Sequence, residues 1–208
     1  MATTQTAPKK GLINFDFLQK LGKVLMTVIA VMPAAGLMIS LGKLVQMSGG
    51  DIAAVMTIGT TMENIGWAVI NNLHILFAVA IGGSWAKERA GGAFAAVLAF
   101  ALINVITGNI FGVTSAMLAD PNAVTHTLFG QEIAVNGYFT SVLGAPALNM
   151  GVFVGIIAGF VGGVAYNKYY NFRKLPDALS FFAGTRFVPI VSMVFAIITG
   201  AILFVVWP

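Results

Sequence analysis

His74 is the ionisable residue that lies deepest within an apolar run of this sequence, in the string N-N-L-H-I-L-F. An ionisable side chain inside a membrane is costly, so it is a candidate for function. The simpler alternative is a neutral imidazole that hydrogen-bonds to a neighbouring helix, through Asn71 or Asn72. We favour this structural role and keep a role in a polar pathway as the alternative.

Two further polar residues are weaker candidates. Asn104 lies within a later apolar run, where it could line a polar pathway or hydrogen-bond between helices. Arg186 stands where a basic segment meets the last apolar run. We expect Arg186 to anchor the chain at the membrane boundary, with a gating or coupling role as the alternative.

The residue types exclude several kinds of chemistry. The sequence has no Cys, which excludes a disulfide, a thiolate metal site and a cysteine phospho-carrier. Its two His and its widely separated carboxylates assemble neither a metal site nor a catalytic triad. No G-x-x-x-x-G-K-[ST] string is present to form a phosphate loop. We therefore expect no catalytic residue, no metal and no cofactor in this chain.

The composition is that of an integral membrane protein. Hydrophobic residues make up 58% and charged residues 9%, with a mean hydropathy of +0.91. A soluble domain carries about a quarter charged residues. The net charge of +4 is located at the ends of apolar runs, so it indicates membrane topology rather than nucleic-acid binding.

Four glycines stand four residues apart, in the string G-V-F-V-G-I-I-A-G-F-V-G-G. On a helix this spacing places all four on one face and forms a ridge without side chains. In a bilayer such a ridge lets another helix approach closely. We predict a helix-packing surface formed by Gly151, Gly155, Gly159 and Gly163, either within one subunit or between two.

Apolar runs long enough to cross a bilayer recur along the chain. The predicted fold is an all-α membrane protein with about five transmembrane helices, preceded by a polar tail over 1–11 and a short amphipathic surface helix over 12–23. We expect Pro33 to kink the first span. The predicted spans are 24–42, 65–85, 90–118, about 149–166 and 187–207.

The segments between these spans are predicted to be less regular. Residues 46–64 are expected to form a loop with one surface-lying turn or helix. Residues 119–148 contain two turn signals and are expected to form a structured loop, with a hairpin as one form. The charges of successive connections alternate between net positive and net negative, beginning with a positive N-terminus. The positive-inside rule therefore places the N-terminus and the basic connector 167–186 in the cytoplasm.

That connector carries a recognisable motif, Y-N-K-Y-Y followed by K-L-P-D-A-L-S-F-F-A-G-T-R-F-V-P-I. Together with V-M-P-A-A-G-L near the start and V-V-W-P at the end, it resembles the membrane-embedded IIC component of phosphotransferase-system (PTS) sugar permeases. The resemblance is to the glucose/N-acetylglucosamine/maltose superfamily and runs from about residue 12 to 208. Thr185 departs from the pattern, which usually has Lys before the Arg.

The resemblance implies a bacterial cell-membrane protein and a IIC domain of two halves, of which residues 12–208 match the first. That half is an interface or scaffold through which two protomers associate. The sugar-contacting strings of the second half, like G-L-H-H and T-E-P, do not occur here, so no sugar-binding residue is carried over. The chain also stops at Pro208 without a polar tail, so we expect further chain to follow.

Partners are implied by the same resemblance. They are a second copy of the chain or a full-length permease, and the lipid bilayer. The IIB and IIA phosphocarrier domains are expected to act with the parent, which is the complete permease to which this chain corresponds in part. No nucleic acid is expected as a partner. The parent complex is a sugar phosphotransferase, but this chain carries no phosphorylation site, so its status as an enzyme stays open. We expect it to serve a glucose-type permease as a dimer-forming scaffold that does not transport sugar alone. The alternatives are a stand-alone interaction protein that associates with intact permease and a small channel gated at His74.

Overall fold

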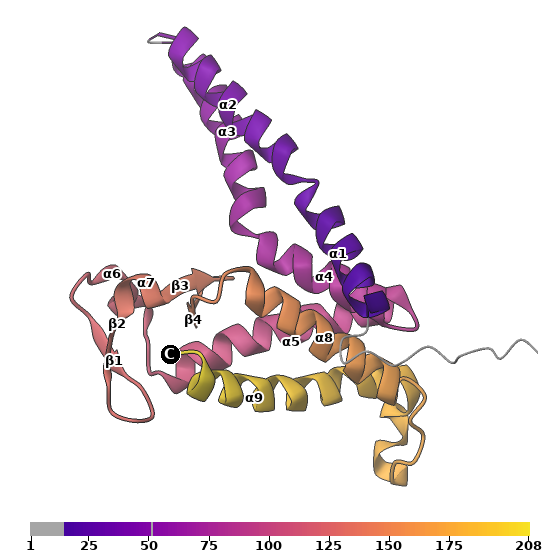
Figure 1. The fold of residues 1–208 in the computed structure, drawn as a ribbon. Helices are drawn as coiled ribbons and strands as arrows, with labels where there is room; N and C mark the ends of the chain where they lie inside the picture. Colours follow the sequence, from indigo (N-terminus) through magenta and orange to yellow (C-terminus); the bar gives the residue numbers. More distant parts are fainter. Residues whose placement is uncertain (1–14, 51) are drawn as a thin grey trace, which may run out of the picture.

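A computed structural model describes residues 15–50 and 52–208 of the chain (Figure 1). The predicted polar tail over 1–11, and the first three residues of the predicted surface helix, lie outside these residues. The described part is mainly helical. Its α-helices are α1 Phe15–Ile29, α2 Met32–Ser48, α3 Ala53–Asn71, α4 Leu73–Trp85, α5 Arg89–Ile110, α6 Ser115–Ala119, α7 Val135–Tyr138, α8 Val152–Tyr169 and α9 Val188–Val206.

Four stretches of helix are long and apolar enough to cross a membrane, and a fifth is possible if the bent pair α3–α4 counts as one span. This agrees with the predicted number of about five. The four are Phe15–Ser48, Arg89–Ile110, Val152–Tyr169 and Gly184–Val206.

The N-terminal helix is longer than predicted. α1 continues through the predicted boundary at residue 23 and ends at Ile29. The chain then turns at Ala30 and Val31, and Pro33 lies in the first turn of α2. Proline has no N–H to donate and its ring crowds the carbonyl four residues earlier, so the helix breaks just before it. The bend expected from Pro33 is therefore a short break between two helices.

The prediction of a loop over 46–64 is wrong. α2 extends to Ser48 and α3 begins at Ala53, and the two helices form a long antiparallel hairpin that projects from the rest of the molecule (Figure 1). Polar side chains of α3 are satisfied within the helix itself. The hydroxyls of Thr57 and Thr61 donate to carbonyls one turn earlier in α3.

The second predicted span, 65–85, is also broken. α3 and α4 meet at an angle of 50° at Asn72. The Asn72 side chain donates to the carbonyl of Ala68, 2.7 Å away, and so satisfies one of the carbonyls at the end of α3. This break creates a corner, and a polar cavity lies beside it.

α5 forms the centre of the body, in contact with α4, α8 and α9 (Figure 1). The buried side chains of Phe100 and Ile103 lie in its middle. α5 ends at Ile110, and Gly112 adopts a positive φ of 66° in the turn that follows. The third predicted span, 90–118, is therefore broken before α6, as its excess length suggested.

The segment 119–148 contains two antiparallel β-hairpins, as expected for a structured loop. β1 Val124–His126 pairs with β2 Glu132–Ala134, and β3 Phe139–Val142 pairs with β4 Ala145–Leu148. β4 packs against α5, because Gly108 leaves room for the backbone of Pro146. The second hairpin is thereby held against the centre of the body.

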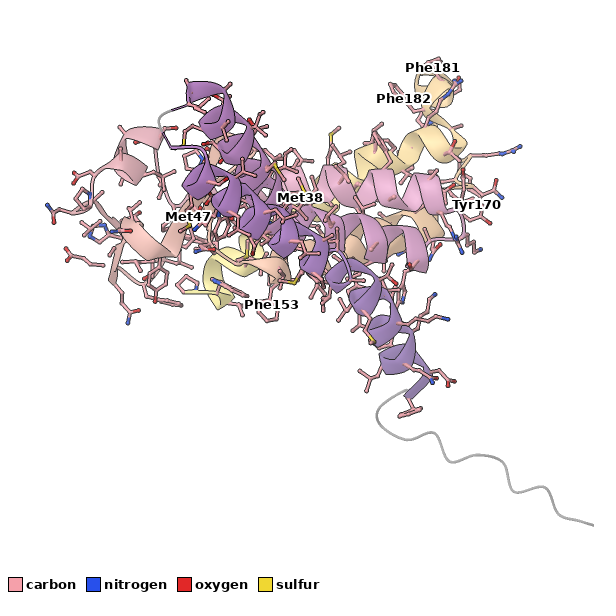
Figure 2. The ribbon with its side chains drawn as sticks, turned by 90° about the horizontal axis from the view of Figure 1, so that it is seen from above. Met38, Met47, Phe153, Tyr170, Phe181 and Phe182 are labelled. Atoms are coloured by element: carbon pink, nitrogen blue, oxygen red, sulfur yellow. The ribbon has the colours of Figure 1, made fainter. Side chains whose placement is uncertain are left out.

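The basic segments meet at the opposite end of the molecule. The connector between α8 and α9 contains two 3-10 helices, η1 Asp177–Phe182 and η2 Gly184–Phe187. The Lys87 ammonium lies 3.3 Å from the Tyr170 hydroxyl, and Lys20 lies over the Trp85 ring. Figure 2 shows Tyr170, Phe181 and Phe182 at this end and the β-hairpins at the other. Gathering of the basic segments at one end is what the predicted orientation requires.

Candidate functional site

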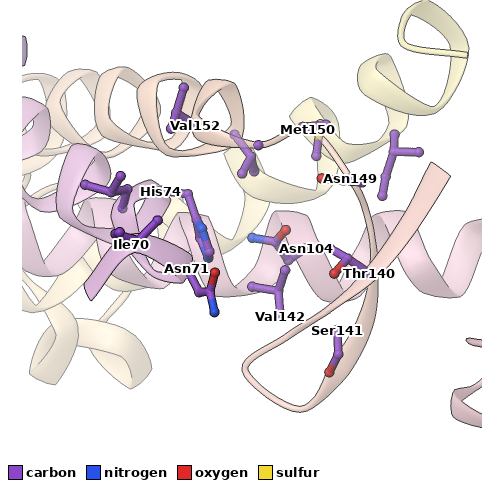
Figure 3. A pocket seen from close by; sticks show the side chains of 14 residues that line it. Ile70, Asn71, His74, Asn104, Thr140, Ser141, Val142, Asn149, Met150 and Val152 are labelled. Carbon is purple, nitrogen blue, oxygen red and sulfur yellow. The ribbon is translucent and has the colours of Figure 1, made fainter. Parts of the chain in front are cut away.

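A cavity of about 470 Å³ lies beside the corner between α3 and α4. Figure 3 shows Asn71, His74 and Asn104 around it, with Thr140 and Ser141 contributed by β3. The remaining lining residues come from the ends of α3 and α4, from the second hairpin and from the start of α8. They are Ile70, Leu73, Val142, Leu148, Asn149, Met150, Gly151, Val152 and Val154.

Asn104 is the most deeply buried polar residue of the lining, with 1% of its surface exposed. Its amide nitrogen donates to the carbonyl of Phe100 over 2.8 Å. Its Oδ1 has no hydrogen-bond partner among the described residues. A buried carbonyl oxygen without a partner is costly, so this oxygen is available to accept a hydrogen bond from a polar group that enters the cavity.

His74 lines the same cavity but is held by stacking. Its ring lies 5.1 Å from the ring of Phe100, with 26° between the two planes. Within residues 15–50 and 52–208, no hydrogen bond joins its side chain to Asn71 or Asn72. The Asn72 side chain bonds to Ala68 instead. The structure therefore brings His74 and Asn104 together in one cavity, without the inter-helix hydrogen bond that we favoured for His74.

The predicted glycine ridge lies mostly between α8 and α4. A Cβ at Gly155 would overlap with the carbonyl of His74, and one at Gly159 would lie 2.6 Å from the Cβ of Ile81. A Cβ at Gly163 would lie 3.2 Å from the Cβ of Trp85. These three glycines pack within the subunit. Gly151 lies outside the helix as its N-cap, with a positive φ of 53° and no neighbour near its missing side chain.

Arg186 lies far from the cavity, at the end where the basic segments gather. Its guanidinium is 4.7 Å from the ring centre of Phe181 and donates to the carbonyl of that residue over 3.4 Å. With Glu88 and Tyr166 it lines a small hollow of about 280 Å³. The structure therefore separates Arg186 from His74 and Asn104.

A polar contact between α8 and the turn from α4 to α5, at the same end, was not predicted. The Tyr166 hydroxyl donates to the Glu88 carboxylate. The Asn167 side chain accepts from the backbone N–H of Lys87 and donates to the carbonyl of Trp85, each over 2.7 Å. Asn167 thereby satisfies backbone groups where α4 ends. Its position within Y-N-K-Y-Y is the sequence signal that could have identified it.

The cavity contains amide, hydroxyl and imidazole groups and no carboxylate, so it can bind a polar group but holds no acid–base pair. Within the described part of the chain, no three His, Asp or Glu side chains are close enough to hold a metal ion. The apolar helices pack against one another through glycines, and the cavity between them is lined in part by uncharged polar groups. These features are those of a multi-pass membrane protein.

Residues 22–208 match the family described as "Phosphotransferase system, EIIC". The chain therefore belongs to the phosphotransferase-system EIIC family, as the connector motif indicated. Membership in this family, together with the apolar helices, makes it an integral protein of the bacterial cell membrane.

Two curated proteins illustrate the similarity. The chain is 65% identical over 199 residues to the "PTS system glucose-specific EIICBA component" of Streptococcus pneumoniae, an alignment that covers 96% of the chain and 27% of that protein. It is 36% identical over 203 residues to the protein of the same name from Staphylococcus carnosus, with 93% of the chain and 28% of that protein covered. The chain thus spans little more than a quarter of the length of these relatives.

Proposed function

We propose that this chain is the dimer-forming scaffold part of the membrane component of a glucose permease of the phosphotransferase system, and that it does not transport sugar alone. The proposal of glucose is supported by the 65% identity to a relative named glucose-specific. Both relatives are named EIICBA components, so we propose that IIB and IIA phosphocarrier parts act with the parent of this chain.

The α2–α3 hairpin is the observation that carries the proposal. It stands away from the body (Figure 1). Along α2, exposed apolar side chains recur at spacings of four and three residues and so form a stripe on one face of the helix. Met47 near the tip is 82% exposed, and Figure 2 shows it with Met38 on this hairpin. The stripe consists of Leu37, Leu41, Leu44 and Met47.

Charged and polar side chains next to this stripe favour a protein partner over lipid alone. The Lys43 ammonium lies 3.6 Å from the Glu63 carboxylate, which also accepts from Gln46 over 2.9 Å. A charged pair on an apolar hairpin is costly to expose to lipid. A second copy of the hairpin would cover the pair while it packs against the stripe.

The inner face of the hairpin is already filled. Cβ atoms at Gly42 and Gly59 would lie 2.6 and 2.7 Å from backbone atoms of the facing helix. Because these glycines hold α2 against α3 within one subunit, the outer stripe of α2 is free for contact between subunits. This arrangement suits a fixed frame that carries two transport halves.

Single cysteines test the dimer, because the chain has no native Cys. We expect Met47→Cys or Leu44→Cys to form disulfide-linked dimers in membranes under mild oxidation. Ile197→Cys serves as the control, because it is exposed on α9 to a similar degree as Leu44 on α2. Cross-linking at Ile197 but not on the hairpin would refute this interface.

An interaction protein that associates with intact permease is the second candidate, since the same exposed hairpin could pair with a full-length partner. Co-expression of the tagged chain with intact permease distinguishes this candidate from the scaffold proposal. An excess of mixed dimers over dimers of the chain with itself would favour the interaction protein. A channel gated at His74 is less well supported. Gly159 and Gly163 pack closely against α4 beyond the cavity, which argues against a continuous pore.

A further inference from the structure

A second hollow, of about 880 Å³, lies at the surface between α1, the end of α4 and the start of α5. Its walls are apolar or small, with Val24 from α1, Val79, Ala80 and Gly83 from α4, and Ala93 from α5. It is larger than the polar cavity beside His74 and contains none of the same residues. We call it the α1–α4 groove.

Three cations stand at one end of this groove. Lys20 and Lys23 come from α1, Arg89 is the first residue of α5, and all three are exposed. None of the three forms an ion pair with any acidic side chain that the structure describes. No acidic residue lines the groove. The groove therefore has an apolar floor and an uncompensated positive mouth.

Aromatic residues place this mouth at the level of lipid headgroups. The Lys20 ammonium lies 4.7 Å from the ring centre of Trp85, and the Phe17 ring packs against the same Trp85. Tryptophan is enriched where a helix leaves the hydrocarbon region. From Lys20 to Thr27, α1 follows the groove for seven residues, or about 10 Å at 1.5 Å per residue. The apolar floor thus extends from the headgroup level into the hydrocarbon region.

We propose that the α1–α4 groove binds one anionic phospholipid. Its phosphate lies among Lys20, Lys23 and Arg89, and an acyl chain lies along Val24 and Val79. A free phosphate would leave the apolar floor uncovered, and a zwitterionic lipid would leave the cations without net compensation. Basic pockets between helices at the cytoplasmic side are suited to such headgroups.

The bound lipid would strengthen the contact between α1 and the rest of the molecule, which is small. α1 contacts the rest of the described chain mainly through α4, where Val28 packs with Leu73 and Phe77. A lipid in the groove would touch both α1 and α5 and so add a link between these two helices. We therefore expect anionic lipid to stabilise the position of α1 against the body.

Native mass spectrometry of the purified 208-residue chain tests the proposal, with dioleoylphosphatidylglycerol and dioleoylphosphatidylcholine as probes. We expect selective retention of phosphatidylglycerol. Lys20→Gln/Lys23→Gln/Arg89→Gln should weaken its binding by about fivefold for each charge, on the order of a hundredfold in total. The control Lys168→Gln/Arg173→Gln/Lys174→Gln removes the same charge at the same end and should retain the lipid.

Two further measurements distinguish the alternatives. Thr27→Trp narrows the apolar floor without changing the charge, so it should also weaken lipid binding. Competition by inorganic phosphate alone would identify a free-anion site and overturn the proposal. The proposal would also be overturned if phosphatidylcholine were retained equally, or if the two charge variants lost the lipid equally. It would be overturned as well if no lipid were retained, which is the result expected if a protein segment fills the groove. Circular dichroism of each variant shows that the helices are intact.

Discussion

Gly155 of α8 lies directly against the backbone carbonyl of His74 at the start of α4. The contact joins two helices that are about eighty residues apart in the sequence, and it stands next to the polar cavity. Because the neighbouring atom belongs to the backbone, it cannot move aside as a flexible side chain could. Of the four glycines in the predicted ridge, Gly155 makes the closest approach to α4. An added side chain there should therefore disturb the packing of α8 on α4 the most.

We expect Gly155→Ala to destabilise the chain by roughly 1–3 kcal/mol, the usual cost of an extra methylene in a filled interior. Gly36→Ala is the matched control, since nothing lies within 4 Å of its missing side chain. That change should be neutral or stabilising by up to about 1 kcal/mol, because alanine favours a helix. Thermal unfolding in detergent measures both, and equal midpoints for the two variants would contradict the packing described.

Removing the Asn167 side chain should loosen the end at which α4 meets α8. Asn167→Ala leaves the Lys87 N–H and the Trp85 carbonyl without this partner. The expected loss is roughly 1–2 kcal/mol for two hydrogen bonds at a partly exposed site. Asn171→Ala, at an exposed position on the same connector, is the control. If both variants melt at the same temperature, Asn167 does not stabilise the contact between α8 and the end of α4.

The predicted orientation can be tested with single cysteines at two exposed residues. Asn171→Cys lies on the basic connector and Asn122→Cys in the turn before β1. The positive-inside rule places the connector in the cytoplasm. A membrane-impermeant thiol reagent should therefore label Asn122→Cys in intact cells and Asn171→Cys only after permeabilisation. The reverse pattern would show that the basic segments face outward.

Much of the fold could be predicted from the sequence, because a bilayer permits few solutions for long apolar runs. The ends of α8 and α9 lie close to the predicted boundaries. The spacing of the glycines also indicated a packing face, although Gly162, which faces Ala96 of α5, was missed.

The errors have local physical causes. The expectation of a loop over 46–64 rested on the charged residues Asp51 and Glu63 around a short apolar stretch. The Glu63 carboxylate, however, accepts hydrogen bonds from Gln46 and Trp67 within the hairpin. The break at Asn72 was missed because neither glycine nor proline stands there. A side chain that bonds back to its own helix, or across to the next one, leaves no clear signal in a hydropathy pattern.

The cavity could be predicted only in part. His74 and Asn104 stood out as polar residues inside apolar runs. Thr140 and Ser141 did not, because they reach the cavity through the fold of a hairpin about forty residues further along the chain than Asn104. Contacts of that kind depend on tertiary packing, which periodicity and composition do not encode.

Uptake of labelled glucose is the most direct test of the scaffold proposal. Cells that lack their own glucose permease, but retain the general phosphotransferase proteins, are given the 208-residue chain and compared with the same cells expressing an intact permease. Membrane insertion of the chain is verified in parallel by immunoblot. We predict that cells with the chain alone accumulate no more sugar phosphate than empty cells. Saturable accumulation in those cells would show that this chain transports sugar and would contradict the account.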